Sequence, residues 1–216
     1  MVVGLLSKVS MRVNFKALPE TLLILLILIS ANLKSMDGKE NVKTEFATFG
    51  GGCFWCLEAV FRLVPGVISV TNGYAGGITK NPTYKDVCSG NTGHAEVIQI
   101  EYDPKKVSYE QLLKIFWKSH DPTSLNRQGA DIGTQYRSII LYHNEYQKKI
   151  AEESKAAISK QFTNTIVTEI LPFNVFYKAE EYHQDFYRKN PDYGYCRAII
   201  KPKIDKLQSV LNQKKN

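Results

Sequence analysis

The feature that most constrains the fold of this chain is the segment GGGCFWCLEAVF at residues 50–61. A strand-like stretch, EFATF, leads into the three glycines, and a helical pattern runs over residues 55–63 until Pro65-Gly66 ends it. Cys53 therefore lies where a strand gives way to a helix. Because the free N–H groups and the positive end of the helix dipole favour a thiolate, we predict that Cys53 is a nucleophile.

The pattern of the remaining chain predicts a ferredoxin-like α+β fold. Alternating residues indicate strands at residues 67–72, 95–102, 135–142 and 165–171, and two further helices begin after Ser108, which forms a capping box with Gln111, and at Asn144. The order β-α-β, loop, β-α-β is that of a two-layer α/β sandwich with a mixed, largely antiparallel sheet and helices packed on it. Beyond Pro172 we predict a short helix near residues 179–188 and then a long C-terminal coil. The loops at residues 73–93 and 121–134 are long enough to suggest function.

Length and hydropathy divide the chain into four parts. Residues 1–35 have a basic lead, an apolar run at residues 22–29 and Ala31 after it, which is typical of a secretory signal. We expect export or a membrane tether through residues 18–33, and the alternative is a cytoplasmic protein translated from Met36. Residues 36–44 form a polar linker, residues 45–200 one catalytic domain, and residues 201–216 a basic tail that could be helical.

Charge and cysteine content exclude two classes of protein. The formal charge is +7, but much of it lies at the two ends and no run of Lys and Arg reaches five, so we expect no nucleic-acid partner. Four unevenly spaced cysteines are too few for a disulfide-stapled mini-protein and suggest redox chemistry instead. We expect a monomer without a metal or other cofactor.

Five segments in order resemble the peptide methionine sulfoxide reductase A family: GCFWC, GYAGG, NPTYKDVCSGNTGHAEVIQIEYDP, DPTSLNRQGADIGTQYRS and AEEYHQDFYRKNPDYGYC. Together they cover residues 45–200, and their shared order is far more specific than any one motif. The resemblance implies the α/β-sandwich fold of that family and reduction of the S epimer of methionine sulfoxide. It also implies thioredoxin, or a similar dithiol reductant, as the electron donor, and a role in the repair of proteins under oxidative stress.

The chemistry of the residues agrees with this resemblance. A thiolate can attack the sulfur of a sulfoxide, but the oxygen leaves only when a general acid protonates it. Glu96 begins a core strand, where partial burial would raise its pKa and keep it protonated. On spacing alone a glutamate facing water is equally consistent, and the resemblance assigns Glu96 as the acid.

The resemblance also assigns the residues around the substrate. The hydroxyls of Tyr84 and Tyr136 would donate to the sulfoxide oxygen, and Asp131 would orient them. Phe54 and Trp55 would hold the methyl group of the substrate. From residue type alone, burial in the core is the commoner fate of tyrosine and of paired aromatic residues.

Two thiols compete to resolve the sulfenic acid that Cys53 would carry after oxygen transfer. Cys56 has the CxxC spacing that closes readily, and Cys196 lies in DYGYC, where Gly194 permits its approach. Family members with CFWC often lack the GYC cysteine, and those with GYC often have Gly in place of Cys56, whereas this chain has both. We expect Cys196 to react first, with Cys56 competing or relaying the disulfide. Cys88 is expected to be a buried structural thiol.

The same residues are compatible with three other kinds of protein. A thioredoxin-like disulfide exchanger built on the CxxC would show no dependence on Glu96. A zinc site with Cys88 and Cys196 lacks a second CxxC or HxxxH, and a Cys-His protease would need a base where this chemistry needs an acid. His183 is expected to be a satisfied histidine of the surface or core rather than a catalytic one.

Overall fold

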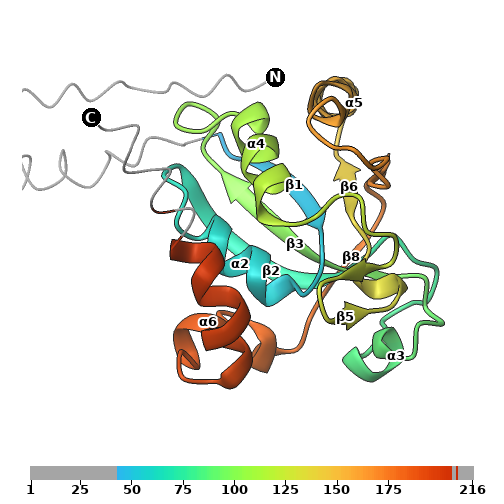
Figure 1. Ribbon diagram of the computed structural model, residues 1–216, viewed down its shortest axis with the longest axis vertical. Coiled ribbons are helices and arrows are strands. Elements are labelled where there is room, and N and C mark those ends of the chain that lie inside the picture. The colour runs from blue at the N-terminus through green and yellow to red at the C-terminus, as the bar shows by residue number, and fades with distance from the viewer. Residues whose placement is uncertain (1–42, 206–207, 209–216) are drawn as a thin grey trace, which may run out of the picture. The chain divides into compact units, whose positions relative to one another are not determined.

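A six-stranded sheet forms the centre of the computed structural model, which describes residues 43–205 and 208 (Figure 1). Its order is β7-β6-β1-β3-β2-β8, in which β6 and β7 are parallel and the other neighbours antiparallel. The strands are β1 (Glu45–Gly50), β2 (Val67–Ala75), β3 (Ala95–Tyr102), β6 (Ile139–Tyr142), β7 (Glu169–Pro172) and β8 (Phe176–Lys178). A separate hairpin pairs β4 (Arg127–Gln128) with β5 (Asp131–Ile132).

The four central strands have the predicted ferredoxin-like order. Helix α2 (Phe54–Phe61) connects β1 to β2, and helix α4 (Tyr109–Ser119) follows β3 on the way to β6. In the sheet these strands lie in the order β6-β1-β3-β2, and α2 and α4 pack on one face of it (Figure 1). The predicted fold class is therefore confirmed.

Alternation along β3 divides its side chains between two cores. Ile98 and Ile100 point to the layer of α2 and α4, where the larger core lies. Ala95 and Val97 point to the opposite face, where a smaller cluster lies. Because successive side chains of a strand alternate, Glu96 shares the face of Ile98 and points toward the helices.

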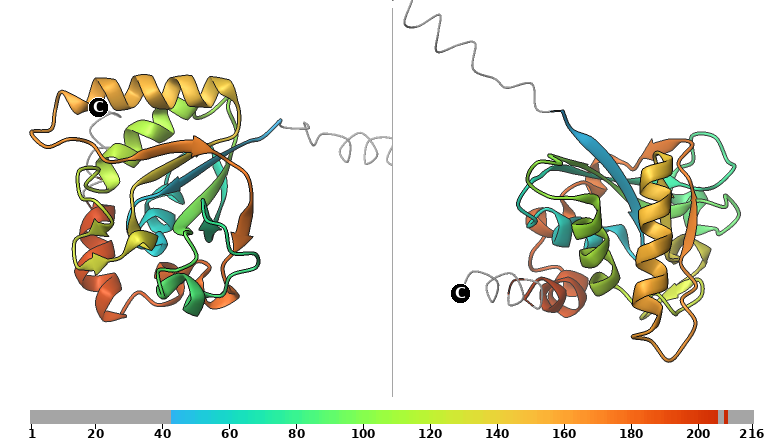
Figure 2. Two further views of the ribbon diagram at one scale, coloured as in Figure 1. Left: turned by 90° about the vertical axis from the view of Figure 1, so that its right-hand side faces the viewer. Right: turned by 90° about the horizontal axis from the view of Figure 1, so that it is seen from above.

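The predicted helix starts are present. Ser108 Oγ accepts from the backbone N–H of Gln111 at 3.3 Å, and Gln111 Oε1 accepts from the N–H of Ser108 at 2.8 Å, which completes the capping box. Helix α5 (Glu145–Ser159) begins after Asn144 and lies beside α4 (Figure 2). Trp117 Nε1 donates to Ser154 Oγ at 2.8 Å and joins the two helices.

The two predicted loops contain short elements that their composition concealed. Helix α3 (Tyr84–Cys88) lies in the first loop and begins with a capping box of Thr83 and Asp86, and the hairpin β4–β5 lies in the second. The strand predicted at residues 135–142 begins only at Ile139, because Gly133, with a φ of 144°, precedes a 3-10 turn at Thr134–Tyr136. Strand β7 begins four residues later than predicted, and β8 has no counterpart among the predictions.

The C-terminal segment contains more helix than its predicted coil. A 3-10 turn (Glu181–His183) and helix α6 (Phe186–Lys189) occupy the predicted short helix, separated by Asp185 with a φ of 57°. A π-helical turn (Cys196–Ile200) then continues as helix through residue 205. Cys196 and Ile200 are both buried, so this stretch packs by an apolar stripe that its position after the GYC motif did not reveal.

The predicted signal or anchor segment at residues 1–35 lies outside the described residues, as does nearly all of the polar linker. Among the helices of residues 43–205, none has the length and apolar character that a membrane span requires.

Candidate active site

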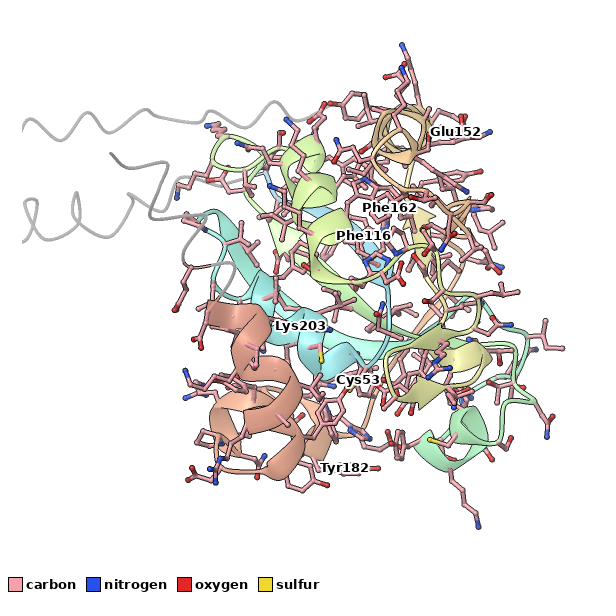
Figure 3. The ribbon with its side chains drawn as sticks, in the orientation of Figure 1. Cys53, Phe116, Glu152, Phe162, Tyr182 and Lys203 are labelled. Atoms are coloured by element: carbon pink, nitrogen blue, oxygen red, sulfur yellow. The ribbon has the colours of Figure 1, made fainter. Side chains whose placement is uncertain are left out.

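Cys53 is the N-cap residue of α2 and lies near the β4–β5 hairpin (Figure 3). Only 8% of its surface is exposed. Gly52 before it has a φ of +84°, and a Cβ there would lie 2.6 Å from the side chain of Gln128, so this position requires glycine. The N–H of Gly52 donates to the carbonyl of Tyr136 at 3.1 Å. The strand-to-helix junction thus brings two loop segments against the thiol.

Glu96 places a buried carboxyl group at the same helix end. It is 1% exposed, and its Oε2 accepts a hydrogen bond from the backbone N–H of Phe54, the residue after Cys53, at 3.0 Å. The pKa of Glu96 is raised to about 8, chiefly by burial and to a lesser degree by the charges of Asp131 and Cys56, while the hydrogen bond from the Phe54 N–H opposes the rise. At pH 7 the carboxyl is therefore protonated and can donate.

Cys53 and Cys56 lie on the same first turn of α2, where the N–H of Cys56 donates to the carbonyl of Cys53 at 3.0 Å. Burial raises the pKa of Cys53, and the hydrogen bond to Cys56 and the charge of Glu96 raise it further. The pKa of Cys56 is lowered to about 7, because the hydrogen bond from Cys53 and the charge of Lys203 outweigh the opposing effect of burial. We predicted that the helix end would favour a thiolate at Cys53. Burial opposes this effect of the helix end and raises the pKa of Cys53.

The predicted polar residues come from three different elements. Tyr84 begins α3, Tyr136 ends the 3-10 turn and Asp131 belongs to β5. Burial raises the pKa of both phenols, and the charge of Glu96 raises each of them further. Both hydroxyls therefore remain hydrogen-bond donors at neutral pH, within electrostatic reach of the same carboxyl group.

Phe54 and Trp55 pack in a cluster of rings with the C-terminal segment. Phe54 is buried, and its ring centroid lies 5.1 Å from that of His183. Trp55 stacks on Phe186 with 3.7 Å between centroids and an interplanar angle of 5°. The ring of His183 also lies 4.5 Å from that of Tyr84. Within the described residues neither ring nitrogen of His183 has a hydrogen-bond partner, so this histidine is held by packing and is not the satisfied residue we expected.

Tyr195 is a residue of the site that sequence reasoning did not single out. Its hydroxyl donates to Asp131 Oδ2 at 2.7 Å and lies 3.6 Å from Cys56 Sγ. Its ring meets that of Trp55 edge to face at 6.1 Å. The available signal was its place next to the cysteine of GYC, but its partner Asp131 is 64 residues away in the chain.

The other two thiols occupy different environments. Cys196 is fully buried in the turn that packs on α2, and burial and then the charge of Cys56 raise its pKa. The prediction that Cys88 is a buried structural thiol was wrong: Cys88 is exposed at the end of α3. A five-residue helix projecting from a loop buries one side only, and there Val87 is the buried residue.

Glu58 fastens the C-terminal segment to α2 and was also missed. It is 1% exposed, and Oε1 accepts from the N–H of Asp185 at 2.7 Å while Oε2 accepts from Asn72 Nδ2 at 2.8 Å. Arg62, one turn further along α2, donates to the same carboxylate from Nη2 at 3.0 Å. A glutamate inside the apolar run LEAVF was the signal, because charged side chains are rarely buried without partners.

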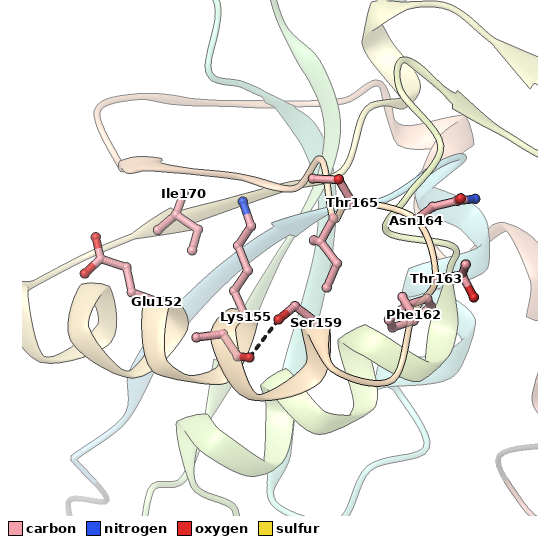
Figure 4. Close-up of a pocket in the computed structure, with 10 residues that line it drawn as sticks. Glu152, Lys155, Ser159, Phe162, Thr163, Asn164, Thr165 and Ile170 are labelled. Atoms are coloured by element: carbon pink, nitrogen blue, oxygen red, sulfur yellow. Dashed lines mark hydrogen bonds between the residues drawn. The ribbon is translucent and has the colours of Figure 1, made fainter.

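A cleft of about 720 Å³ lies elsewhere, between the end of α5, residues 162–166 and β7 (Figure 4). Glu152 and Phe162, which line it, are far from Cys53 in the molecule (Figure 3). The amine of Lys155 donates to the carbonyl of Thr168 at 2.6 Å and is thus engaged in the fold. Among residues 43–205 and 208, no three His, Cys, Asp or Glu side chains are grouped as metal ligands would be.

Comparisons of the sequence and of the structure with known proteins point to one family. A family model described as peptide methionine sulfoxide reductase matches residues 45–216. The peptide methionine sulfoxide reductase MsrA of Saccharolobus solfataricus is 58% identical over 170 residues, which is 79% of this chain and 96% of that protein. The reduced form of Mxr1 from Saccharomyces cerevisiae is similar, with a TM-score of 0.69 and 38% identity over 73% of this chain and 91% of that one. Mxr1 in complex with Trx2 matches with a TM-score of 0.50 and 28% identity over 68% of this chain and 87% of that one.

Proposed function

The chain belongs to the peptide methionine sulfoxide reductase family, and we propose that it reduces the S epimer of methionine sulfoxide through a sulfenic acid at Cys53. Its substrates are oxidised methionines in proteins and the free amino acid, and thioredoxin restores the enzyme. The MsrA relatives and the Mxr1 complex with Trx2 support this reaction, and they do not favour a thioredoxin-like disulfide exchanger. The enzyme is thus an oxidoreductase that repairs oxidised proteins.

One observation carries the proposal: a buried carboxyl group, protonated at neutral pH, lies beside the thiol at the start of α2. Glu96 Oε2 is engaged by the N–H of Phe54, which leaves Oε1 to carry the proton. A sulfoxide oxygen becomes a leaving group only when it is protonated, so an acid in this position suits sulfoxide reduction. Disulfide exchange needs no such acid, and a protease would need a base.

In the first step the sulfur of Cys53 attacks the sulfoxide sulfur and the Cys53 proton passes to the thiolate of Cys56. Glu96 protonates the sulfoxide oxygen, with Tyr84 and Tyr136 donating hydrogen bonds to it. The oxygen then transfers to Cys53, so that the substrate leaves as the reduced thioether and Cys53 becomes a sulfenic acid. Phe54 and Trp55 would receive the substrate's methyl group, and Asp131 would orient the polar groups.

In the second step we propose that Cys56 resolves the sulfenic acid before Cys196 does. The N–H of Cys56 donates to the carbonyl of Cys53 at 3.0 Å, and the pKa of Cys56 is lowered to about 7, whereas burial and the charge of Cys56 raise the pKa of Cys196. Glu96, now a carboxylate, takes the proton from Cys56, and the Cys56 thiolate attacks the sulfur of Cys53. A disulfide forms, and the oxygen leaves with the proton from Glu96 as water. Cys196 can then accept the disulfide from Cys56 and pass it to thioredoxin. This order reverses the one we predicted from the motif alone.

Serine variants at the three cysteines test the proposal. Cys53→Ser should abolish reduction of S methyl sulfoxides. Cys56→Ser should still release one equivalent of the reduced product and lose recycling by thioredoxin, and Cys196→Ser should accumulate a Cys53–Cys56 disulfide that mass spectrometry detects. Cys88→Ser is the matched control. Reduction of R sulfoxides would contradict the proposed epimer, and a Cys53–Cys196 disulfide forming first in the wild type would contradict the proposed order.

We also propose export or membrane tethering by the N-terminal segment and a monomeric working unit. The basic lead and apolar run at residues 1–35 support export, and all the proposed site residues belong to one chain. Fractionation of cells that produce the full chain, with the N-terminal sequence of the recovered protein, tests the first. Recovery of the uncleaved chain in the cytoplasm would contradict it. A mass near two chains in light scattering would contradict the second.

A further inference from the structure

Arg137 makes hydrogen bonds to three segments that surround the site. Its side chain is 10% exposed, and Nη1 donates to the carbonyl of Thr134 at 3.0 Å. Nη2 donates to the carbonyl of Gly93 at 3.0 Å and lies 3.4 Å from that of Gly76. Nε donates to Glu169 Oε2 at 3.1 Å, which fixes the plane of the guanidinium. The group thus binds three backbone carbonyls and one carboxylate at once.

Two of those carbonyls lie at the base of the loop of residues 76–94. Gly76 follows the last residue of β2, Gly93 precedes β3 by two residues, and Ala75 pairs with Ala95 across the sheet. Both glycines have positive φ values, 78° and 72°, which turn their carbonyls away from the sheet ladder. Arg137 therefore closes the base of the loop from which Tyr84 projects.

The third carbonyl connects this loop to a different part of the site. Thr134 begins the 3-10 turn that ends at Tyr136, the residue directly before Arg137. The same guanidinium therefore holds the turn of Tyr136 against the base of the loop, and Glu96 follows Gly93 by three residues. Arg137 therefore binds the segments that carry Tyr84, Tyr136 and Glu96, the three residues that would face the sulfoxide oxygen.

His94 fastens the loop in a different way. The N–H of Gly77 donates to His94 Nδ1 at 3.0 Å, so Nε2 carries the ring proton and donates to the carbonyl of Thr79 at 2.8 Å. These bonds hold residues 77–79 against the start of β3, within the loop itself. The bond from Arg137 to Thr134 adds the connection between the loop and the turn of Tyr136.

We propose that Arg137 is a positioning residue of the reductase step, which holds Tyr136 and the loop of residues 76–94 in place relative to Glu96. The inference rests on the proposed function. Arg137 would not touch the substrate. It acts because a shift of about 1 Å in groups that stabilise a transition state can cost about 100-fold in rate. Lysine cannot replace it, because an ammonium lacks the planar fork that reaches three carbonyls.

Replacement of the side chain, followed by chemical rescue, tests this role. In Arg137→Ala, the maximal single-turnover rate constant for reduction of an S methyl sulfoxide should fall by about 10- to 100-fold. The substrate concentration that gives half of this rate should change little. Guanidinium chloride at millimolar, non-denaturing concentration should restore part of the rate, because the free cation can occupy the vacated site. The same salt should not accelerate the wild type or Arg188→Ala, whose arginine is exposed and bound to Asp185.

Arg137→Lys keeps the charge and covers the case in which Arg137→Ala does not fold. It should be folded by circular dichroism, reduced in kcat by about tenfold and insensitive to guanidinium, since its side chain fills the site. Wild-type rates in the folded variants, or a slow Arg137→Ala that guanidinium does not rescue, would overturn the inference. If the wild type itself did not reduce S sulfoxides, the proposed function would fail instead, so the two failures are distinct.

Discussion

The two sides of the site depend to different degrees on specific hydrogen bonds. On one side β1, α2 and β3 position Cys53 and Glu96 through the apolar core that lies between sheet and helices. On the other side the C-terminal segment, residues 179–205, adds Cys196 and Ile200 to the same core and is also joined to α2 by buried hydrogen bonds to Glu58. Burial of apolar surface is not directional, whereas hydrogen bonds are. The position of the first side therefore depends mainly on the pattern of apolar residues, and that of the second depends also on particular polar partners.

Asn72 shows how specific those partners are. Its N–H donates to Gln184 Oε1 at 2.9 Å, and Gln184 Nε2 donates back to the carbonyl of Asn72 at 3.0 Å. Its amide also donates to Glu58 Oε2 and to the carbonyl of His183, each at 2.8 Å. The C-terminal segment therefore adds to β2 and α2 almost as a further strand would, but through side chains. Cys53 and Glu96 therefore belong to the central sheet-and-helix layers, whereas the C-terminal segment beside Trp55 is joined to those layers by specific side-chain hydrogen bonds.

Glu96→Gln should have the largest effect and should be confined to the first side. Glutamine keeps the size of the side chain but carries no acidic proton, so the single-turnover rate should fall by roughly 10²- to 10⁴-fold. The pKa of Glu96 is raised to about 8, so the acid is present below that pH, and wild-type kcat/KM should decline as the pH rises through 8. The variant should lose this decline. Stopped-flow measurement of product between about pH 6 and pH 10 would record both the lower rate and the loss of the pH dependence.

Glu101→Gln is the matched control for this substitution. It lies on the same strand, five residues on and therefore on the opposite face, where it accepts from Thr44 and Ser69. It should keep both the rate and the pH profile of the wild type. If Glu96→Gln retained the decline above pH 8, a different group would be the acid, and Glu96 would not belong to the reacting side of the site.

The same division explains what the sequence could reveal. Alternation along residues 95–102 predicted β3 with its observed bounds and put Glu96 on the face of Ile98, because a period of two needs no distant partner. The bond of Tyr195 to Asp131 joins residues 64 apart, and the bond of Asp185 to Glu58 joins residues 127 apart. No local pattern encodes such pairs. The order in which Cys196 and Cys56 react also cannot be read from the motif, since it depends on the burial and contacts of the thiols, which the motif does not display.

Glu58→Ala should act on the second side with a smaller effect. It removes the acceptor of Asp185, Asn72 and Arg62, and leaving buried donors without partners costs about 1–3 kcal/mol in the free energy of unfolding. Hydrogen exchange should become faster at residues 183–189 and stay unchanged in β3. Recycling by thioredoxin should suffer more than the single turnover, because the anchor holds the segment that leads to Cys196.

Glu58→Gln provides the control of matched size and should recover part of the stability. It keeps one oxygen to accept from the N–H of Asp185. Equal loss of exchange protection in β3 would show that the two sides unfold together, and the division between them would then have no energetic meaning.

Tyr195→Phe should have the smallest effect and is the finest test of the comparison. The change removes one hydroxyl, which donates to Asp131 and lies 3.6 Å from Cys56 Sγ, and keeps the ring against Trp55. Loss of one such hydrogen bond costs about 0.5–1.5 kcal/mol. The pKa of Cys56 is lowered to about 7, first by the hydrogen bond from Cys53 and also by the Tyr195 hydroxyl, so that pKa should rise in the variant. Alkylation of Cys56 measured against pH by mass spectrometry should show the shift. An unchanged alkylation profile would mean that the C-terminal segment covers the thiol pair without influencing its charge. The segment would then act only by packing beside the bound substrate.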